Sequence, residues 1–218
     1  MVNTSGYLLS IIIPTYNNAE LITATLASIH QSITDDVEVI IVNDGSTDLT
    51  EERINAFYRE KDCHNVKYIS QKNQGVAITR NVGLAHATGK YIGFVDSDDY
   101  VSETMFEEMY NLAIKYDAEM TICNLQKVDE NGSVTQKLTQ LPGFPEKIIL
   151  KDNLSVFSDI SYFACNKIFH RDLFDGKRFK KGVHFEDIEL IPQLLLQCRT
   201  LAFTPNYHYQ YLERQDSI

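Results

Sequence analysis

The sequence predicts an α/β fold in which a mostly parallel sheet is covered by helices on both faces. Short apolar runs rich in β-branched residues alternate four times with helical patterns, and the spacing of roughly 30 residues is typical of strand–helix units. Polar clusters follow three of the predicted strands, at 14–18, 43–46 and 96–99. Because the carboxyl ends of parallel strands meet at one edge of a sheet, we expect a ligand site there.

The predicted strands and helices alternate regularly up to residue 125. Buried strands are predicted at 8–14, 37–42, 66–70, 91–95 and 120–125. Helices are predicted between the first two strands and then at 48–57, 75–88 and 102–116. The first helix carries Ile22, Leu26 and Ile29 on one face, as an amphipathic helix does.

Local signals set the expected ends of several elements. Asp48 and Glu51 have the spacing of a capping box at the start of the second helix. Gly89 is expected to end the third helix. Asn131-Gly132, flanked by β-prone residues, predicts a β-hairpin with a type I′ turn.

The regular alternation ends near residue 125. Beyond it we expect loop at 136–160, a helix at 185–198 with a kink at Pro192, and a strand-like tail at 207–218. We therefore expect one domain over residues 1–218, with a regular half at 8–125 and a less regular half at 126–218.

The composition is that of an ordinary globular domain. The 218 residues are 44% hydrophobic and 23% charged, which is enough to bury a core. The net charge of -10 argues against a nucleic-acid partner, since no basic face is available to neutralise a phosphate backbone. The four cysteines lie far apart without zinc-ligand spacing, so we expect reduced thiols.

The sequence favours a cytoplasmic location. It lacks the basic n-region of a signal peptide, and no apolar run approaches the roughly 20 residues that span a bilayer. The segment FDGKRFKKG (174–182) is the one basic stretch suited to a membrane surface, and it is short. Peripheral association with the inner face of the plasma membrane stays open, as does a homodimer.

Three carboxylates follow a predicted strand in the stretch YIGFVDSDDY. Like charges so close raise each other's pKa, so Asp96, Asp98 and Asp99 are expected to have a positive partner. Asp96 and Asp98 are hard oxygen ligands of the kind that Mg²⁺ or Mn²⁺ takes while it bridges substrate phosphates. One alternative is a plain acidic turn before a helix. An EF-hand is disfavoured because Val101 stands where that loop requires glycine.

The chain carries no glycine-rich phosphate loop. Neither G-x-G-x-x-G nor G-x-x-x-x-G-K-[ST] occurs, which excludes a Rossmann dehydrogenase and a P-loop enzyme. The first turn, PTYNN, also lacks the basic, glycine-rich loop of sugar-nucleotide pyrophosphorylases. Asp44 ends the second strand, where an acid in nucleotide-binding α/β folds accepts hydrogen bonds from a ribose or base. An Asx-turn is the local alternative.

Four segments occur in order along the chain: SIIIPTYNN, VEVIIVNDGSTD, NQGVAITRNVGLAHATGKYIGFVDSDD and FEDIEL. Each is weakly specific alone, but together they closely resemble family 2 glycosyltransferases of the GT-A fold, a bacterial group that makes surface polysaccharides. The resemblance is strong over residues 8–116 and weaker beyond. It implies a Rossmann-like α/β/α sandwich in which 8–125 binds the nucleotide-sugar and 126–218 faces the acceptor. Many members of the family are longer, so a further C-terminal segment stays open.

The resemblance implies a donor site for a UDP-sugar and for Mn²⁺ or Mg²⁺. Asp98 is the expected direct metal ligand, Asp96 lies nearer the ribose and sugar, and Asp99 supports them or caps a helix. The other residues expected at the donor are Pro14, Thr15, Tyr16, Asn18, Asp44, Asn73, Gly75, Arg80 and Ser97. For Arg80, a salt bridge on a helix face is the alternative.

The resemblance also implies the chemistry. Asp187 of the Glu186-Asp187 pair is the expected base that takes the proton of the acceptor hydroxyl, and the anomeric centre is inverted. Acidic enrichment in a first helical turn is the alternative for this pair. His208 and Arg214 are further expected contacts of the diphosphate, and a packed strand position is the alternative for His208.

The implied activity is transfer of a hexosyl or N-acetylhexosaminyl unit from a UDP-sugar to a saccharide or lipid-linked saccharide, in cell-surface polysaccharide synthesis. A non-catalytic sugar-nucleotide-binding module is the alternative. The sequence departs from the family pattern in one respect, because it has no Trp and YFACNKIF lacks the aromatic residue that often precedes N-K-[LI]-[FY]. Tyr162 or Phe163 is the expected substitute in the acceptor surface.

Overall fold

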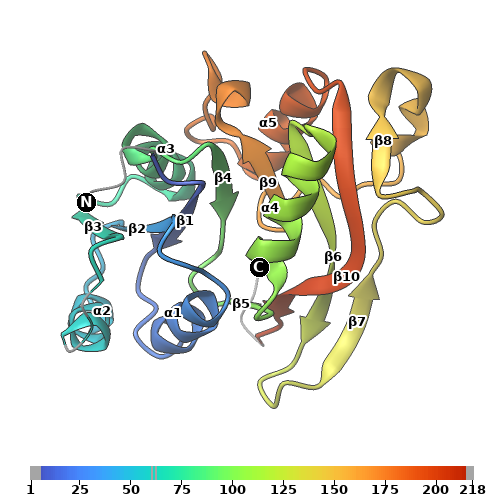
Figure 1. The fold of residues 1–218 in the computed structure, drawn as a ribbon. Helices are drawn as coiled ribbons and strands as arrows, with labels where there is room; N and C mark the ends of the chain where they lie inside the picture. The colour runs from blue at the N-terminus through green and yellow to red at the C-terminus, as the bar shows by residue number, and fades with distance from the viewer. Residues whose placement is uncertain (1–5, 60, 62, 215–218) are drawn as a thin grey trace.

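The first half of the chain builds four parallel strands joined by helices, as the sequence predicts (Figure 1). The computed structural model describes residues 6–59, 61 and 63–214. The strands are β1 (Leu9–Thr15), β2 (Val37–Asn43), β3 (Val66–Ser70) and β4 (Tyr91–Phe94). The helices between them are α1 (Ile22–Gln31), α2 (Thr50–Tyr58) and α3 (Val76–His86). All seven residues of β1 are buried, because β2 and β4 flank it and helices cover both faces of the sheet.

The second half extends the same sheet. Its elements are β5 (Tyr100–Val101), α4 (Met105–Tyr116), β6 (Met120–Val128), β7 (Val134–Leu138), β8 (Lys147–Ile149), β9 (Lys167–His170), α5 (Glu186–Leu195) and β10 (Thr200–Leu212). Three 3₁₀ helices, η1 (Leu150–Asp152), η2 (Leu154–Phe157) and η3 (Arg171–Phe174), lie in the connections. The strand order is β3-β2-β1-β4-β9-β6-β10-β5, with β7 on β6 and β8 on β10.

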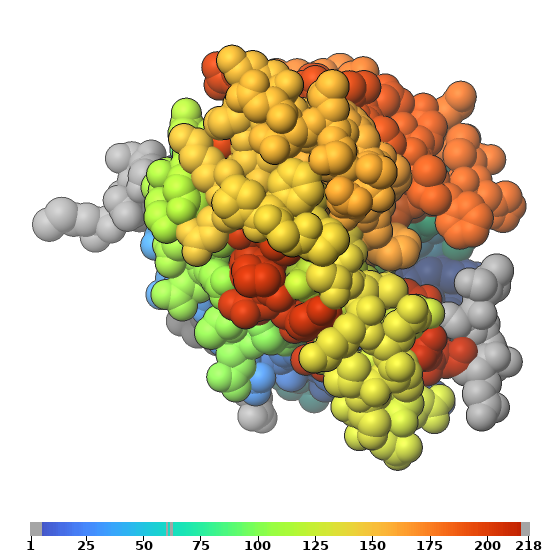
Figure 2. Space-filling view, turned by 90° about the vertical axis from the view of Figure 1, so that its right-hand side faces the viewer, coloured from blue at the N-terminus to red at the C-terminus, as the bar shows by residue number. Residues whose placement is uncertain are grey.

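β9 joins the four strands of the first half to β6, and β10 extends the sheet beyond β6. β9 is antiparallel to β4 on one side and to β6 on the other, so β6 again runs parallel to β4. β10, red in Figure 1, pairs with β6 through two register shifts and bends toward β5. Figure 2 shows β7 and the segment after it, in yellow and amber, covering much of the face beside β10.

Helices cover the sheet on both faces, which confirms the predicted sandwich. On one face Leu9, Ile11 and Ile13 of β1 belong to a buried cluster with α1, α2 and α4. On the other face Ile12 packs in a second cluster, which includes α3 and α5. Successive side chains of a strand point to opposite faces, so one apolar run feeds both cores.

The predicted type I′ turn at Asn131-Gly132 is wrong. A type I′ turn needs positive φ at both central residues, but only Gly132 has it (φ 78°) and Asn131 does not. The hairpin forms as expected, yet the N–H of Gly132 donates to Asp129 O, and Asp129 Oδ1 accepts from Asn131 N and Ser133 N.

The predicted capping box is also wrong. Asp48 Oδ1 accepts from the N–H and hydroxyl of Thr50 instead of from Glu51, and Asp48 Oδ2 accepts from Ala19 N. Asp48 therefore joins the turns before α1 and α2. Likewise α3 ends at His86, before Gly89, because Ala87 already has extended backbone angles.

The segment expected to be loop at 136–160 contains regular structure. β7 continues to Leu138, β8 pairs with β10, and η1 and η2 follow. Pro192 lies inside α5, and the tail forms β10, with residues 215–218 outside the described part of the chain. All four cysteines are free thiols.

Candidate active site

The ends of β1, β2 and β3 bring the expected nucleotide residues around one cavity. This cavity of about 210 Å³ is lined by Pro14, Thr15, Tyr16, Asp44, Asn73, Gly75, Val76 and Thr79. The first six of these are residues that the sequence assigns to the donor, and they come from three segments of the chain. The Thr15 hydroxyl is buried and has no hydrogen-bond partner among the described residues. The predicted donor residues at the ends of these strands therefore share one cavity.

Asp44 lines this cavity and binds the loop at 71–75. Its Oδ1 accepts from Gln71 Nε2 at 2.6 Å and from Gln74 N at 2.9 Å, and its Oδ2 accepts from Gly75 N at 2.8 Å. Gln74 N also lies 3.2 Å from Oδ2, so three donors make four contacts with the buried Asp44 carboxylate and hold the loop after β3. The Asx-type contact in this turn belongs to Asn43, whose Oδ1 accepts from Ser46 N.

Two glycines allow the loop to close over Asp44. Gly45 has φ 72°, and a Cβ atom there would lie 2.9 Å from Asn73 N, so a side chain would push the loop at 71–75 away. Gly75 has φ 91° and presents its N–H to Asp44 immediately before α3. Both positions need the left-handed backbone region that glycine tolerates best.

Asn18 and Ser97 do not line this cavity, but a hydrogen bond between them joins two of the turns at the strand ends. The buried Asn18 side chain donates from Nδ2 to Ser97 Oγ at 3.0 Å, and its N–H donates to Thr50 Oγ1 at 2.7 Å. Ser97 is the central residue of the D-x-D. The polar contact between Asn18 and Ser97 therefore links the turn after β1 to the turn after β4.

Each of the three carboxylates after β4 has a separate partner. Asp96 Oδ1 accepts from Arg80 Nη2 at 2.8 Å, and Asp98 accepts from Arg214 Nη2. The buried Asp99 accepts from Tyr209 Oη at 2.6 Å and from a backbone N–H of β10. The positive charge that the sequence requires is thus supplied by two arginines from distant segments.

The D-x-D turn has a donor set suited to Mg²⁺ or Mn²⁺. The Asp96 and Asp98 carboxylates are partly exposed, with a guanidinium already beside each. Burial and then Asp96 raise the pKa of Asp98, while Arg214 lowers it, so a cation there would favour the ionised form. No group of three metal-ligating side chains occurs among the described residues. One or two carboxylates fit the way Mg²⁺ binds together with substrate phosphates.

Arg80 lies deeper than the sequence suggests and has two carboxylate partners. Its guanidinium donates from Nη2 to Asp96 and from Nη1 to Glu186, and its Cζ lies 5.4 Å from the centroid of the Phe179 ring. Burial alone would lower the pKa of Arg80, but Asp96 and Glu186 outweigh burial and raise it. Arg80 does not line the nucleotide cavity. Arg80 forms salt bridges, as the alternative expects, but they are buried instead of lying on an exposed helix face, and its contact with the donor stays a prediction.

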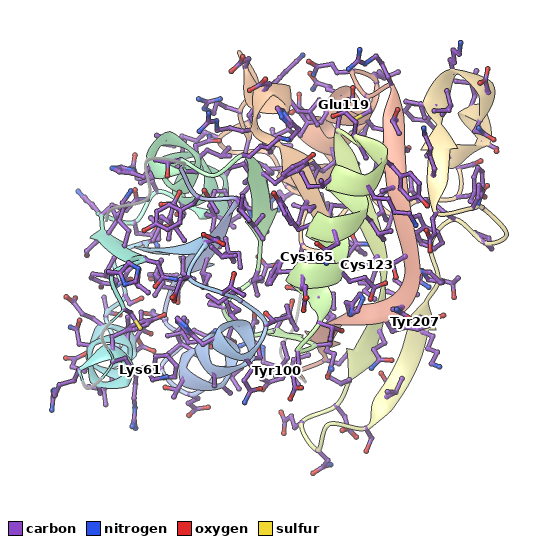
Figure 3. All side chains as sticks on the ribbon, in the orientation of Figure 1. Lys61, Tyr100, Glu119, Cys123, Cys165 and Tyr207 are labelled. Atoms are coloured by element: carbon purple, nitrogen blue, oxygen red, sulfur yellow. The ribbon has the colours of Figure 1, made fainter. Side chains whose placement is uncertain are left out.

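A second cavity of about 240 Å³ lies beside the carboxylates. Polar groups on its wall include Arg80, Asp96 and Asp187, and the remaining lining residues are Leu125, Lys127, Leu138, Phe163, Ala164, Cys165, Phe185 and Tyr211. Cys165, labelled in Figure 3, is buried, and burial followed by the charge of Asp96 raises its thiol pKa well above the usual value. The Cys165 thiol is therefore an unreactive part of the wall.

Glu186 and Asp187 begin α5 and take different positions. Glu186 is buried against Arg80, whereas Asp187 is half-buried and lines the second cavity. Asp187 Oδ1 accepts from Ile188 N at 2.9 Å, which holds the carboxylate at the helix start. The same turn also contains Glu189, so the acidic enrichment of the alternative is present as well.

His208 lies away from both cavities. Its Nδ1 is 2.6 Å from Ser102 Oγ and its Nε2 is 2.8 Å from Glu108 Oε2, which uses both ring nitrogens in a buried network. Arg214, by contrast, reaches Asp98 directly. The structure thus places only Arg214 of the two at the D-x-D turn.

Three residues that the sequence left without a role support the site. Tyr209 Oη bonds Asp99 and also accepts from Asp96 N at 3.2 Å. Asn81 pairs with both backbone groups of Phe179 at 2.8 and 2.9 Å. The buried Lys167 holds a loop described below. No local pattern marks Tyr209 or Asn81, because their partners lie far along the chain, whereas Lys167 belongs to the N-K-[LI]-[FY] segment and bonds residues close to it.

No helix in the described part of the chain combines the length and apolar character needed to cross a membrane. This finding concerns only those helices.

Comparisons with known proteins show which family the sequence matches. The family described as Glycosyl transferase family 2 matches residues 10–176. Glycosyltransferase GlyA of Streptococcus pneumoniae is 29% identical over 96% of this chain and 31% of its own length. Glycosyltransferase GlyG of the same organism is 28% identical over 97% of this chain and 72% of its length. The uncharacterized glycosyltransferase YibD of Escherichia coli is 28% identical, and this chain spans 64% of its length.

Solved structures share the fold. Staphylococcus aureus TarS (residues 1–349), in complex with UDP-GlcNAc, has a TM-score of 0.80 at 23% identity and covers 96% of this chain and 59% of its own. A mannosyltransferase from Pyrobaculum calidifontis, in complex with GDP-Man and Mn²⁺, has a TM-score of 0.71 at 18% identity and covers 98% of this chain and 59% of its own. These neighbours establish the GT-A fold.

Proposed function

Because the chain belongs to glycosyl transferase family 2, we propose that it transfers a hexosyl or N-acetylhexosaminyl unit from a UDP-sugar to a saccharide or lipid-linked saccharide acceptor. The product would belong to a cell-surface polysaccharide. The observation that carries this proposal is that Asp44 lines one cavity at the strand ends while Asp96 of the D-x-D turn and Asp187 line a second cavity together. Residues 8–125 would bind the donor, and residues 126–218 would face the acceptor.

The first cavity would hold the uridine. Asp44 lines this cavity, where its carboxylate would face the ribose or the base. Tyr16 is 49% exposed at the cavity mouth, so its ring can cover a base. Asn73 and Gly75 would close the opposite side.

The second cavity would hold the reacting groups. An acceptor hydroxyl oxygen forms a bond to the anomeric carbon while the bond from that carbon to the diphosphate oxygen breaks, and its electron pair leaves with UDP. Asp187 takes the hydroxyl proton as general base. Attack from the side opposite the leaving group inverts the anomeric centre, so an α-linked donor gives a β-glycoside.

Asp98, with Asp96, would hold a divalent cation. When bound, Mg²⁺ or Mn²⁺ stabilises the negative charge on the departing diphosphate. Arg214 would then exchange Asp98 for a phosphate oxygen, since its side chain is 43% exposed and its guanidinium already lies against Asp98 beside the proposed metal site. A guanidinium binds phosphate and carboxylate oxygens with the same fork of N–H groups.

Thermal unfolding with UDP tests the donor site. At about one hundred times its dissociation constant, a ligand stabilises a protein by about 2.7 kcal/mol, which is a rise in Tm of roughly 5–10 °C for a chain of this size. We expect that rise with UDP and MnCl₂ together and a smaller one with UDP alone. Indifference of Tm to both would contradict the proposal.

Replacing the proposed base separates an enzyme from a binding module. Asp187→Asn keeps the size of the side chain and removes the proton acceptor, so we expect UDP binding to persist and transfer to fall by at least about a hundredfold. A panel of UDP-sugars, assayed by UDP release, identifies the donor. Unchanged transfer in Asp187→Asn would remove Asp187 from this role.

A further inference from the structure

We propose that the cavity beside Asp187 is an acceptor subsite for one neutral sugar ring, which packs against Phe163 and Phe185. This inference rests on the proposed function and adds the chemical class of the acceptor. The cavity of about 240 Å³ is smaller than the roughly 300–1,000 Å³ of complete small-molecule sites. It therefore suits a single terminal sugar residue better than a longer oligosaccharide.

Two phenylalanine rings stand exposed at this cavity. Phe163 is 41% exposed and Phe185 is 70% exposed, and both line the cavity together with Asp187. The face of an aromatic ring carries partial negative charge, which complements the C–H groups on the apolar face of a pyranose. Exposed aromatic side chains beside a proposed general base indicate a surface for a ligand.

The backbone of Phe185 is held in an unfavourable conformation. Its φ is 58°, in the left-handed region that bulky L-residues rarely adopt. Glu186 follows directly and is buried on Arg80, so the chain is fixed where α5 begins. Strained backbone that the surrounding structure maintains is characteristic of functional sites. Here the consequence is an outward ring next to Asp187.

The loop that carries Phe163 is fixed from inside by Lys167. The buried Nζ of Lys167 donates to Ser161 O at 2.7 Å, to Phe163 O at 2.8 Å and to Asn166 Oδ1 at 2.7 Å. Tyr162 instead donates its hydroxyl to Phe157 O at 2.6 Å and packs against the core. Of the two expected substitutes for the missing Trp, Phe163 is therefore the one at the cavity. A backbone already held in place loses less conformational entropy when a ligand binds to the residue that it carries.

The charges around the cavity favour a neutral acceptor. Both cations on its wall are already paired, Arg80 with Asp96 and Glu186, and Lys127 with Glu213 at 2.9 Å. Asp96 and Asp187 add negative charge to the same wall. A uronate or a polyol phosphate placed here would meet carboxylates without an unpaired cation on the wall, which disfavours anionic acceptors.

Saturation-transfer NMR on the 218-residue chain, with UDP and MgCl₂ present, tests this inference. The neutral probes are methyl β-D-glucopyranoside, methyl β-D-galactopyranoside and the methyl β-glycoside of N-acetylglucosamine. The anionic probes are methyl β-D-glucuronide and glycerol 3-phosphate. We expect at least one neutral probe to receive saturation on its ring C–H protons and to bind more tightly than both anions.

Variants at the two ends of α5 supply the comparison. Phe185→Ala removes the ring, so we expect the affinity for the neutral probe to fall roughly tenfold, the upper range for loss of one aromatic contact, and Phe185→Tyr to restore it. Leu196→Ala is the matched control, because Leu196 is also 70% exposed and lies at the far end of the same helix. Phe163→Ala carries the same expectation should Phe185→Ala fail to fold.

Several results would overturn the inference. One is tighter binding of an anionic probe, and another is an equal effect of Phe185→Ala and Leu196→Ala. If UDP with metal raises Tm but no neutral probe binds, the acceptor inference alone fails. If UDP leaves Tm unchanged, the proposed function fails first.

Discussion

Arg80 Nη2 lies 2.8 Å from Asp96 Oδ1, and the same guanidinium also donates to Glu186. One buried side chain of α3 therefore joins the turn after β4 to the first residue of α5. Its planar fork suits this task, because separate N–H groups point to separate carboxylates. The D-x-D turn and the start of α5, which carries Asp187, thus share this internal support.

Replacing Arg80 by Met should lower the free energy of unfolding by about 3 kcal/mol or more, since it leaves the buried Glu186 carboxylate and the partly exposed Asp96 without their partner. Arg80→Lys should recover only part of this loss, because one ammonium group cannot span both carboxylates in the same geometry. Urea unfolding followed by circular dichroism measures the effect.

The exposed pair between Lys115 and Glu146 provides the control for this prediction. Both side chains are more than half exposed, and ion pairs in solvent contribute little to stability. Lys115→Met should therefore change stability far less than Arg80→Met. Equal losses for the two variants would show that the buried pairing does not stabilise the fold.

The sequence predicts the first half of the fold well because its signals are local. β1 to β4 are continuous apolar runs with polar ends, and each pairs with a neighbour through a regular parallel ladder. The segment 136–160 fails for the opposite reason. Ile149 in β8 pairs with Thr200 in β10, fifty-one positions away, and nothing in the short run at 147–149 indicates that partner.

Asp44→Asn should disturb the loop after β3 as well as the donor cavity. The amide nitrogen of asparagine would replace one acceptor that now faces Gln74 N or Gly75 N, so a backbone donor would lose its partner. We expect a loss of roughly 1–3 kcal/mol in unfolding free energy and a smaller rise in Tm with UDP. The exposed Asp152 gives the control, since Asp152→Asn should change neither value.

The candidate site was predictable where it follows from strand ends and not where it depends on long-range contacts. Pro14, Asp44 and Gly75 line one cavity because parallel strands place their carboxyl ends together. The support of Asp99 by Tyr209 joins residues 110 positions apart. The same holds for Arg80. Its second partner, Glu186, is 106 positions away, so no local pattern indicates that Arg80 is part of a buried ion pair.

Lys167 should make stability depend on pH in a direction opposite to that of most lysines. Burial is the main reason that the pKa of Lys167 falls from 10.5 to about 8, because it disfavours the charged form. Between about pH 8 and pH 10.5 the folded chain has released this proton while the unfolded chain still binds it. Stability therefore rises with pH across that window, by at most about 1.4 kcal/mol per pH unit.

Lys167→Met removes this contribution and also leaves three acceptors in its loop without a donor. The variant should be less stable at every pH, and the difference from the wild type should grow as pH rises from 7.5 to 10. Urea unfolding at several pH values measures the difference, in which the contributions of other titrating groups cancel. Lys151→Met is the control, because the Lys151 side chain is exposed. We expect the stability difference between this variant and the wild type to be the same at each pH. A difference for Lys167→Met that does not change with pH would mean that Lys167 titrates alike in the folded and unfolded chains.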